Sequence, residues 1–264
     1  MEIISVINQK GGVGKTTTVI NLAAGLSQLN KKILVIDLDP QGNATTGLGL
    51  SNMDSSSDTI YGLLNGSKEI SQVIKKTQFD NLDIITSNVD LSGLEVETAD
   101  DSNRAFILKA KLTSYLNNSG GSYDYVLIDC PPSLSLLTVM ALVSSSSLLV
   151  PLQTEFFALE GLTQLMKTID RIKINLNPDL KIRGILLTMY DKRNKLSSQV
   201  EKEARDYFSE KVYLTVIPRN VRLSEAPSHG MPVLIYDKSC PGSKSYFNFT
   251  DEFLNQKSII GSAA

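Results

Sequence analysis

The sequence predicts a single α/β domain in which a mostly parallel sheet carries helices on both faces. Short apolar runs alternate along the chain with longer segments of helical periodicity, which is typical of parallel strands joined by crossover helices. Each run is continuously apolar, as expected of strands buried on both faces. No linker rich in Pro, Gly or Ser divides residues 1–260, and residues 261–264 are set aside as a possible remnant of cloning.

The composition is that of a soluble globular protein, with 264 residues, 42% of them hydrophobic and 20% charged. No secretory leader is visible, and the apolar stretch 136–152 is interrupted by serines and Pro151 before it could span a membrane. Cys130 and Cys240 lie far apart without a C-x-x-C pattern, which argues against an iron–sulfur or other metal site. A reducing cytoplasm fits this cysteine usage.

The first element expected is a strand over Ile3–Ile7, and it leads into the segment K-G-G-V-G-K-T-T at 10–17. This is a phosphate-binding loop, because its glycines let successive N–H groups approach phosphate oxygens at the start of a helix. Lys15 is expected on the β- and γ-phosphates and Thr16 on Mg²⁺. An apolar stripe of helical spacing follows, so the context is strand, loop and helix rather than an isolated glycine-rich turn. The fold expected is therefore the three-layer P-loop NTPase fold.

Lys10 departs from an ordinary phosphate loop, which has no requirement for charge at its entrance. With Gln9 and the following G-G-V-G-K-T-T-T, it resembles the deviant Walker-A loop of the ParA/MinD superfamily. The resemblance implies that Lys10 reaches across a dimer interface to the nucleotide of the partner. It also implies a nucleotide-binding role for the whole loop, which consists of Lys10, Gly11, Gly12, Val13, Gly14, Lys15, Thr16 and Thr17.

The apolar run Ile33–Ile36 predicts a second buried strand, and it ends in D-L-D-P-Q-G-N. Asp37 and Asp39 share one face at the carboxyl end of this strand, where open α/β sheets bind ligands. Two carboxylates beside phosphates repel them unless the carboxylates bind a metal ion or a water molecule. The alternative is that both are simple turn and cap residues before Pro40. The string also resembles the second motif of the superfamily. That resemblance implies that Asp39 positions the attacking water and that Asp37 supports the magnesium shell.

The middle of the chain is expected to be less regular. Residues 44–57 are polar and rich in Gly, Ser and Thr, which predicts a loop, and a short helix is expected to begin at Ile60. A strand is expected over Asn81–Thr86 and a helix over Phe106–Leu116. The acidic run at 95–101 predicts a solvated surface.

The segment Tyr125–Asp129 is an apolar strand that ends in an acid, the Walker-B pattern. Asp129 is expected to hold magnesium directly or through water. The remaining elements keep alternating: strands at Leu148–Pro151, Ile185–Met189 and Val212–Ile217, and helices at Ala158–Ile174 and Ser197–Phe208. The aromatic pair Phe156 and Phe157 is expected to pack in the core.

Three longer segments extend the resemblance over nearly the whole chain. They are P-S-L-S-L-L-T, E-F-F-A-L-E-G-L and V-I-P-R-N-V-R-L-S-E-A-P-S-H-G, and they resemble ParA/Soj partition ATPases. The resemblance implies that Pro218 and Asn220 belong to the loop that meets the adenine. The residues alone leave a simple strand end as the alternative for Pro218.

The charge distribution bears on the partners. The net charge of −2 argues against strong general attraction to nucleic acid. However, residues 171–222 hold twelve Lys and Arg against six Asp and Glu, while the rest of the chain holds 14 against 22. This asymmetry predicts an anion-facing surface, with a charged helix face and scattered loops as the alternative. Arg193 and Arg222 align with arginines that the resembling family uses for DNA.

Three functions are compared. The first is a cytoplasmic, nucleoid-associated ATPase that binds ATP and Mg²⁺, forms an ATP-dependent homodimer on nonspecific double-stranded DNA, and is reset by a ParB-like partner. The second is a MinD-like membrane ATPase that positions cell-division or other cargo, but the tail 247–260 carries Asp251 and Glu252 with only Lys257, a poor membrane face. The third, an iron–sulfur or metabolic enzyme, lacks the cysteines. The first function, partition of a chromosome or plasmid, is the one predicted.

Overall fold

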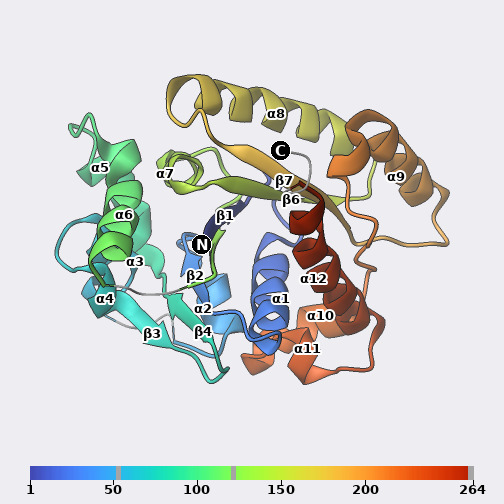
Figure 1. Ribbon diagram of the computed structural model, residues 1–264, viewed down its shortest axis with the longest axis horizontal. Helices are drawn as coiled ribbons and strands as arrows, with labels where there is room; N and C mark the ends of the chain where they lie inside the picture. Colours follow the sequence, from blue (N-terminus) through green and yellow to red (C-terminus); the bar gives the residue numbers. More distant parts are fainter. Residues whose placement is uncertain (52–54, 120–122, 261–264) are drawn as a thin grey trace.

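The computed structural model describes residues 1–51, 55–119 and 123–260. Its centre is a seven-stranded sheet in the order β3-β4-β2-β5-β1-β6-β7 (Figure 1). The strands are β1 Glu2–Val6, β2 Ile33–Asp37, β3 Ile74–Lys76, β4 Leu82–Ile85, β5 Tyr125–Asp129, β6 Ser147–Gln153 and β7 Lys181–Thr188. All pairs are parallel except β3 with β4 at the edge. The predicted α/β fold with a mostly parallel sheet is confirmed.

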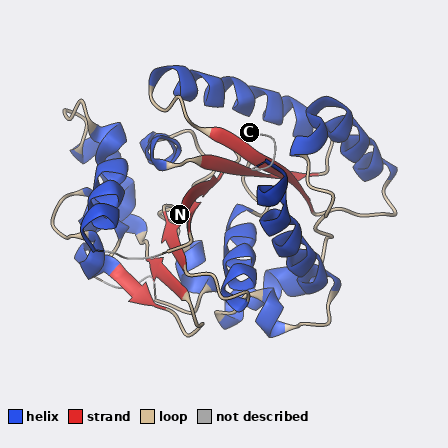
Figure 2. Cartoon of the chain, viewed as in Figure 1, coloured by secondary structure: helices blue, strands red, loops and turns tan. Residues whose placement is uncertain are grey.

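Helices cover both faces of the sheet, so the domain has three layers (Figure 2). Successive side chains of a strand enter opposite layers: in β2, Ile33 and Val35 pack under α1 and α12, while Leu34 and Ile36 pack under the helices of the other face. The helices are α1 Lys15–Gln28, α2 Asn43–Gly47, α3 Ile60–Leu64, α4 Ile70–Val73, α5 Leu94–Glu97, α6 Ile107–Ser119, α7 Leu136–Ser144, α8 Ala158–Asn175, α9 Lys195–Phe208, α10 Val221–Glu225, α11 Val233–Tyr236 and α12 Pro241–Ile260. The helices expected after Ile60, at 106–116, 158–174 and 197–208 are thereby confirmed.

The expected strand at 212–217 is wrong. The segment meets the β7 side of the sheet through isolated bridges at Val212 and Pro218 and through the N–H groups of Tyr213 and Ile217, which donate to the carbonyls of Ile185 and Leu187. Between these points side chains bind its backbone: the Arg205 guanidinium donates to the carbonyls of residues 212–214, and the Glu252 carboxylate accepts the N–H groups of Leu214 and Thr215. An apolar run therefore lies beside the sheet edge without continuing the ladder.

Two further expectations are corrected. Within the expected loop at 44–57, residues 43–47 form the helix α2, which begins after Gly42 in the left-handed region at φ 63°; residues 52–54 lie outside the described part, as do 261–264. Phe156 and Phe157 are 74% and 67% exposed rather than buried. The acidic run at 95–101 is largely exposed, as expected.

Helix α12 closes the face that carries α1. Its residues Tyr246, Phe249 and Phe253 are fully buried, and the Tyr246 hydroxyl lies 3.1 Å from that of Thr18 in α1. Figure 1 shows the two helices side by side. The apolar face of α12 is therefore occupied within the domain. Among the described residues, no helix is both long and apolar enough to cross a bilayer.

Candidate nucleotide-binding site

The loop between β1 and α1 forms a cradle of backbone N–H groups. Gly12 and Gly14 have positive φ angles of 75° and 90°, a conformation that side chains other than glycine rarely adopt. Between them Val13 is buried and anchors the loop. Helix α1 begins at Lys15 directly after Gly14, so its unpaired N–H groups and the positive end of its dipole face any anion held in the loop.

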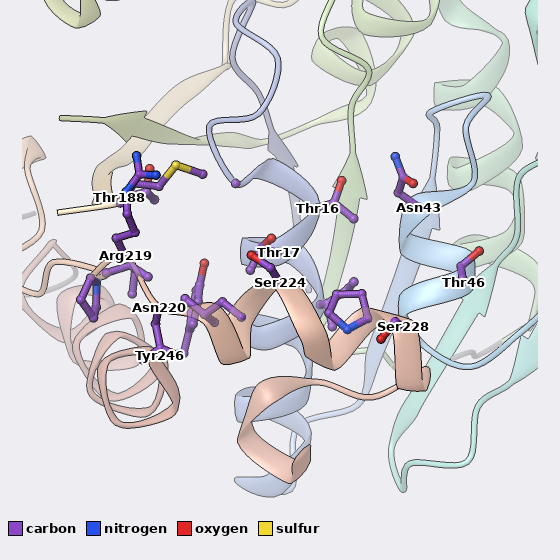
Figure 3. A pocket seen from close by; sticks show the side chains of 17 residues that line it. Thr16, Thr17, Asn43, Thr46, Thr188, Arg219, Asn220, Ser224, Ser228 and Tyr246 are labelled. Atoms are coloured by element: carbon purple, nitrogen blue, oxygen red, sulfur yellow. The ribbon is translucent and has the colours of Figure 1, made fainter. Parts of the chain in front are cut away.

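A cavity of about 490 Å³ opens beside this cradle. Figure 3 shows Thr16 and Thr17 between two ends of the cavity, one with Thr188 and Arg219 and the other with Asn43 and Thr46. The wall opposite α1 is the segment from Ile217 to Ser228. Five predicted residues meet here: Gly14, Thr16, Thr17, Pro218 and Asn220.

Three carboxylates and one ammonium form a buried cluster next to the cavity. Asp37 and Asp129 occupy paired positions at the carboxyl ends of β2 and β5, and Asp39 follows two residues later. Burial lowers the pKa of Lys15, while the charge of Asp129 opposes that shift. The Lys15 ammonium donates to the Lys10 carbonyl at 3.1 Å. The cluster thus places a cation and an excess of negative charge at the edge of the phosphate cradle.

Asp37 already has hydrogen-bond partners within the chain. One carboxylate oxygen accepts the backbone N–H and the hydroxyl of Thr45 at 2.8 and 2.7 Å, and the other accepts the Asp39 N–H at 3.2 Å. Burial raises the pKa of Asp37 to about 6 despite these bonds. In this structure Asp37 therefore fixes α2 and the turn that presents Asp39. Its expected place in the magnesium shell stays a prediction.

Asp129 has the opposite character. Both carboxylate oxygens are buried, and neither has a hydrogen-bond partner in the described part of the chain. Burial raises the pKa of Asp129 well above its usual range, the charge of Asp37 adds to this, and the nearby Thr16 side chain opposes it. Unpartnered buried carboxylate oxygens are costly unless a cation compensates them.

These residues fit Mg²⁺, a hard cation that prefers oxygen ligands and is commonly shared with substrate phosphates. Asp129 and the Thr16 hydroxyl are the groups that would hold it, directly or through water. Within the described ranges no group of three or more His, Cys, Asp and Glu side chains is placed to hold a metal by itself. The phosphates of a nucleotide would have to complete the shell.

Lys10 lies at the rim of the loop, outside the residues that line the cavity. Its ammonium forms an ion pair with Glu155, just after β6. The Lys10 side chain is 49% exposed, so it is accessible from outside the domain. Sequence reasoning did not identify Glu155 as its partner, although the residue stands in a segment that carried the resemblance.

The cavity also contains residues that the sequence interpretation missed, among them Asn43, Thr46, Thr188, Arg219, Ser224 and Tyr246. Asn43, Arg219 and Ser224 stand in segments that carried the resemblance, whereas no local pattern marks Thr188 or Tyr246. Asn220 has a second task as the cap of α10, because its side-chain oxygen accepts the Arg222 N–H at 3.0 Å.

The two arginines expected on DNA lie outside the nucleotide cavity. Arg193 is 90% exposed and forms a two-bond fork with Asp191, at 3.1 and 3.0 Å. Arg222 pairs with Glu225 at 2.7 Å and with Asp237 at 3.5 Å. Not every cation of residues 171–222 is on the surface, since Arg183 is buried.

A parallel sheet that carries a glycine-rich phosphate cradle, a lysine at its edge and two strand-end aspartates defines a P-loop ATPase. Comparison with known proteins narrows this class. A family model described as an AAA domain matches residues 1–182. The chain is 49% identical over 257 residues to the chromosome partitioning protein ParA of Caulobacter vibrioides, covering 97% of this chain and 95% of that protein.

It is also 48% identical over 251 residues to the sporulation initiation inhibitor protein Soj of Bacillus subtilis, with 95% of this chain and 97% of that one covered. Among solved structures, it is similar to cobyrinic acid a,c-diamide synthase from Mycobacterium smegmatis with bound ADP and magnesium. That match has a TM-score of 0.83 and 33% identity, and it covers 98% of this chain and 96% of the other. The chain therefore belongs to the ParA/Soj family of partition ATPases.

Proposed function

We propose that this partition ATPase is a DNA-bound switch: the ATP-bound homodimer holds nonspecific DNA on the nucleoid, and hydrolysis stimulated by a ParB-like partner releases it. As a member of this family the chain hydrolyses ATP to ADP and phosphate, with Mg²⁺ as cofactor. The observation that carries the proposal is the position of Lys10. Lys10 is not among the residues that line the cavity, its ammonium pairs with Glu155, and its side chain is 49% exposed, so a second copy could reach it.

The chain's own residues suggest how hydrolysis proceeds. The loop N–H groups and Lys15 hold the phosphates and balance their charge. Asp39 accepts a hydrogen bond from a water molecule and orients the oxygen of that water toward the γ-phosphorus. A bond forms from the water oxygen to the γ-phosphorus as the bond from the γ-phosphorus to the bridging oxygen breaks; ADP leaves with that oxygen, and the proton of the water passes to the released phosphate. Because a carboxylate that orients water lacks the transition-state charge of an arginine finger, we expect the unstimulated rate to be slow.

DNA binding is proposed to be electrostatic. If Arg193 and Arg222 each meet one phosphate, a monomer makes about two contacts and a dimer about four. The affinity of the dimer for DNA then falls roughly 100-fold between 50 and 200 mM salt and does not depend on the base sequence. In this scheme both arginines exchange their carboxylate partners for DNA phosphates. The exchange keeps the affinity of the monomer for DNA low, so DNA binding depends on the dimer.

The test is retention on nonspecific DNA with a slowly hydrolysed ATP analogue, compared with anionic liposomes. Wild type should bind DNA only with the analogue, and Arg222→Glu should lose DNA while its dimer, measured by light scattering, persists. Lys202→Glu is the matched control, because it makes the same charge change on the outer face of α9, where Lys202 is 76% exposed. Wild-type DNA binding by Arg222→Glu, or strong preference for one sequence, would contradict the assignment. Binding to liposomes instead of DNA would favour the membrane ATPase, against which the buried face of α12 argues.

A further inference from the structure

The last residue of β7 is bonded to the phosphate loop. The Thr188 hydroxyl donates to the Val13 carbonyl at 2.8 Å, in a buried contact between residues 175 positions apart. Val13 stands between the two glycines with positive φ. The loop is thus fixed in the middle by a side chain from the edge strand β7, which is separated from β1 by β6 alone.

This bond orients the peptide that follows Val13. In a trans peptide the C=O of one residue and the N–H of the next point in opposite directions. Because the Val13 carbonyl points at Thr188, the Gly14 N–H points away from it, and Gly14 lines the nucleotide cavity. A phosphate that accepts the Gly14 N–H would polarise the peptide and make the Val13 carbonyl a stronger acceptor. The bond from the Thr188 hydroxyl would therefore strengthen when a phosphate occupies the loop.

Thr188 is followed directly by a conformationally unusual residue. Met189 has φ 51°, a left-handed conformation that costs energy for a side chain of this size and often marks a switch region. Met189 lines the nucleotide cavity. After it comes the basic turn, which we define as residues 190–193. A residue in a strained backbone state between a loop anchor and a surface turn can act as a hinge.

The basic turn is tied to the opposite wall of the cavity as well. The Tyr190 N–H donates to the Ile217 carbonyl at 3.0 Å, and the Arg219 N–H donates to the Tyr190 carbonyl at 3.1 Å. The segment 218–220 lines both the nucleotide cavity and an adjoining hollow of about 560 Å³, which the basic turn lines in full. Movement of the wall or of Thr188 would therefore displace the turn that carries Arg193.

We propose that Thr188 is a positioning residue that couples occupation of the phosphate loop to the placement of the basic turn. The inference deepens the proposed function, because the turn carries one of the arginines assigned to DNA. It is testable without DNA, so its outcome and that of the DNA-binding assay are independent.

The experiment is amide hydrogen exchange of the full chain, with and without a saturating slowly hydrolysed ATP analogue and Mg²⁺. Three proteins are compared: wild type, Thr188→Ser, which keeps the hydroxyl, and Thr188→Val, which keeps the shape and removes the donor. In wild type and Thr188→Ser, the analogue should slow exchange in the basic turn about fivefold or more. In Thr188→Val that response should disappear, while the analogue dissociation constant rises about tenfold or less.

Helix α2 provides the internal control, because Asn43 and Thr46 line the other end of the cavity. Its exchange should respond to the analogue in all three proteins. In steady-state hydrolysis Thr188→Val should raise KM more than Thr188→Ser does. An unchanged turn response in Thr188→Val, no turn response in wild type, or loss of the α2 response along with that of the turn would each overturn the coupling. The last result would mean that Thr188 serves nucleotide binding alone.

Discussion

The ion pair between Lys10 and Glu155 would oppose the homodimer proposed above. If Lys10 must reach the nucleotide of a second copy, each subunit first gives up its bond to Glu155. The two side chains are 49% and 29% exposed, so the pair is a solvent-screened one worth about 0.2–1 kcal/mol. Two subunits together lose about 0.4–2 kcal/mol on dimerisation. Glu155→Gln removes this cost and should lower the dimer dissociation constant about 2- to 30-fold.

Sedimentation equilibrium with the slowly hydrolysed analogue measures that constant. Glu160→Gln is the control, since it removes the same charge from an exposed position five residues further along the chain. The double variant Lys10→Ala/Glu155→Gln should gain nothing over Lys10→Ala, because the freed lysine is absent. A dimer of Glu155→Gln that is no tighter than wild type, or an equal gain in the Lys10→Ala background, would refute the role given to the ion pair.

Three further outcomes are expected. Lys15→Ala should abolish nucleotide binding, because backbone N–H groups alone cannot balance a triphosphate; equal Mg²⁺–ATP affinity by calorimetry would contradict this. Asp39→Ala should bind ATP, stay dimeric and release phosphate at least tenfold more slowly; an unchanged rate would move the water-positioning role to Asp37. The raised pKa of Asp37, about 6 against an ordinary 3.8, stabilises the nucleotide-free fold by about 3 kcal/mol below pH 4. This stability is lost as pH rises through about 6, so Tm should fall across that range, less steeply in Asp37→Asn, and an identical slope in both proteins would exclude Asp37 as the cause.

The strands that are buried along their whole length could be predicted from the sequence, because such burial requires a continuous apolar run. The β2 and β5 segments are buried on both faces, as their continuous apolar runs predict. The phosphate loop is defined by three glycines, of which Gly12 and Gly14 have positive φ and Gly11 does not. The segment 212–217 has the same apolar character, yet Arg205 and Glu252 bind its backbone from distant elements. Side chains that bind a segment's backbone from distant elements leave no signal in its local sequence.

In the candidate site, too, residues of local motifs could be predicted and residues that act through distant contacts could not. Gly14, Thr16 and Asp129 carry local motifs, and the structure places them together. Thr188 and Glu155 act through single contacts across the sheet, with Val13 and Lys10, and their local sequence has no spacing that predicts a role. Contacts of this kind depend on the order of strands, which periodicity does not specify.

The cavity is assembled from stretches that leave the ribosome at very different times. Its cradle ends at Thr17, while its opposite wall lies at 217–228 and the Tyr246 hydroxyl meets Thr18 across 228 positions. At about 5–20 residues per second, the phosphate loop waits roughly 10–40 s for that wall to be synthesised. A nascent chain can therefore offer N–H groups to a phosphate but cannot enclose the base. The cavity is complete only when translation is almost finished, so a product truncated before residue 217 lacks one wall of the nucleotide site.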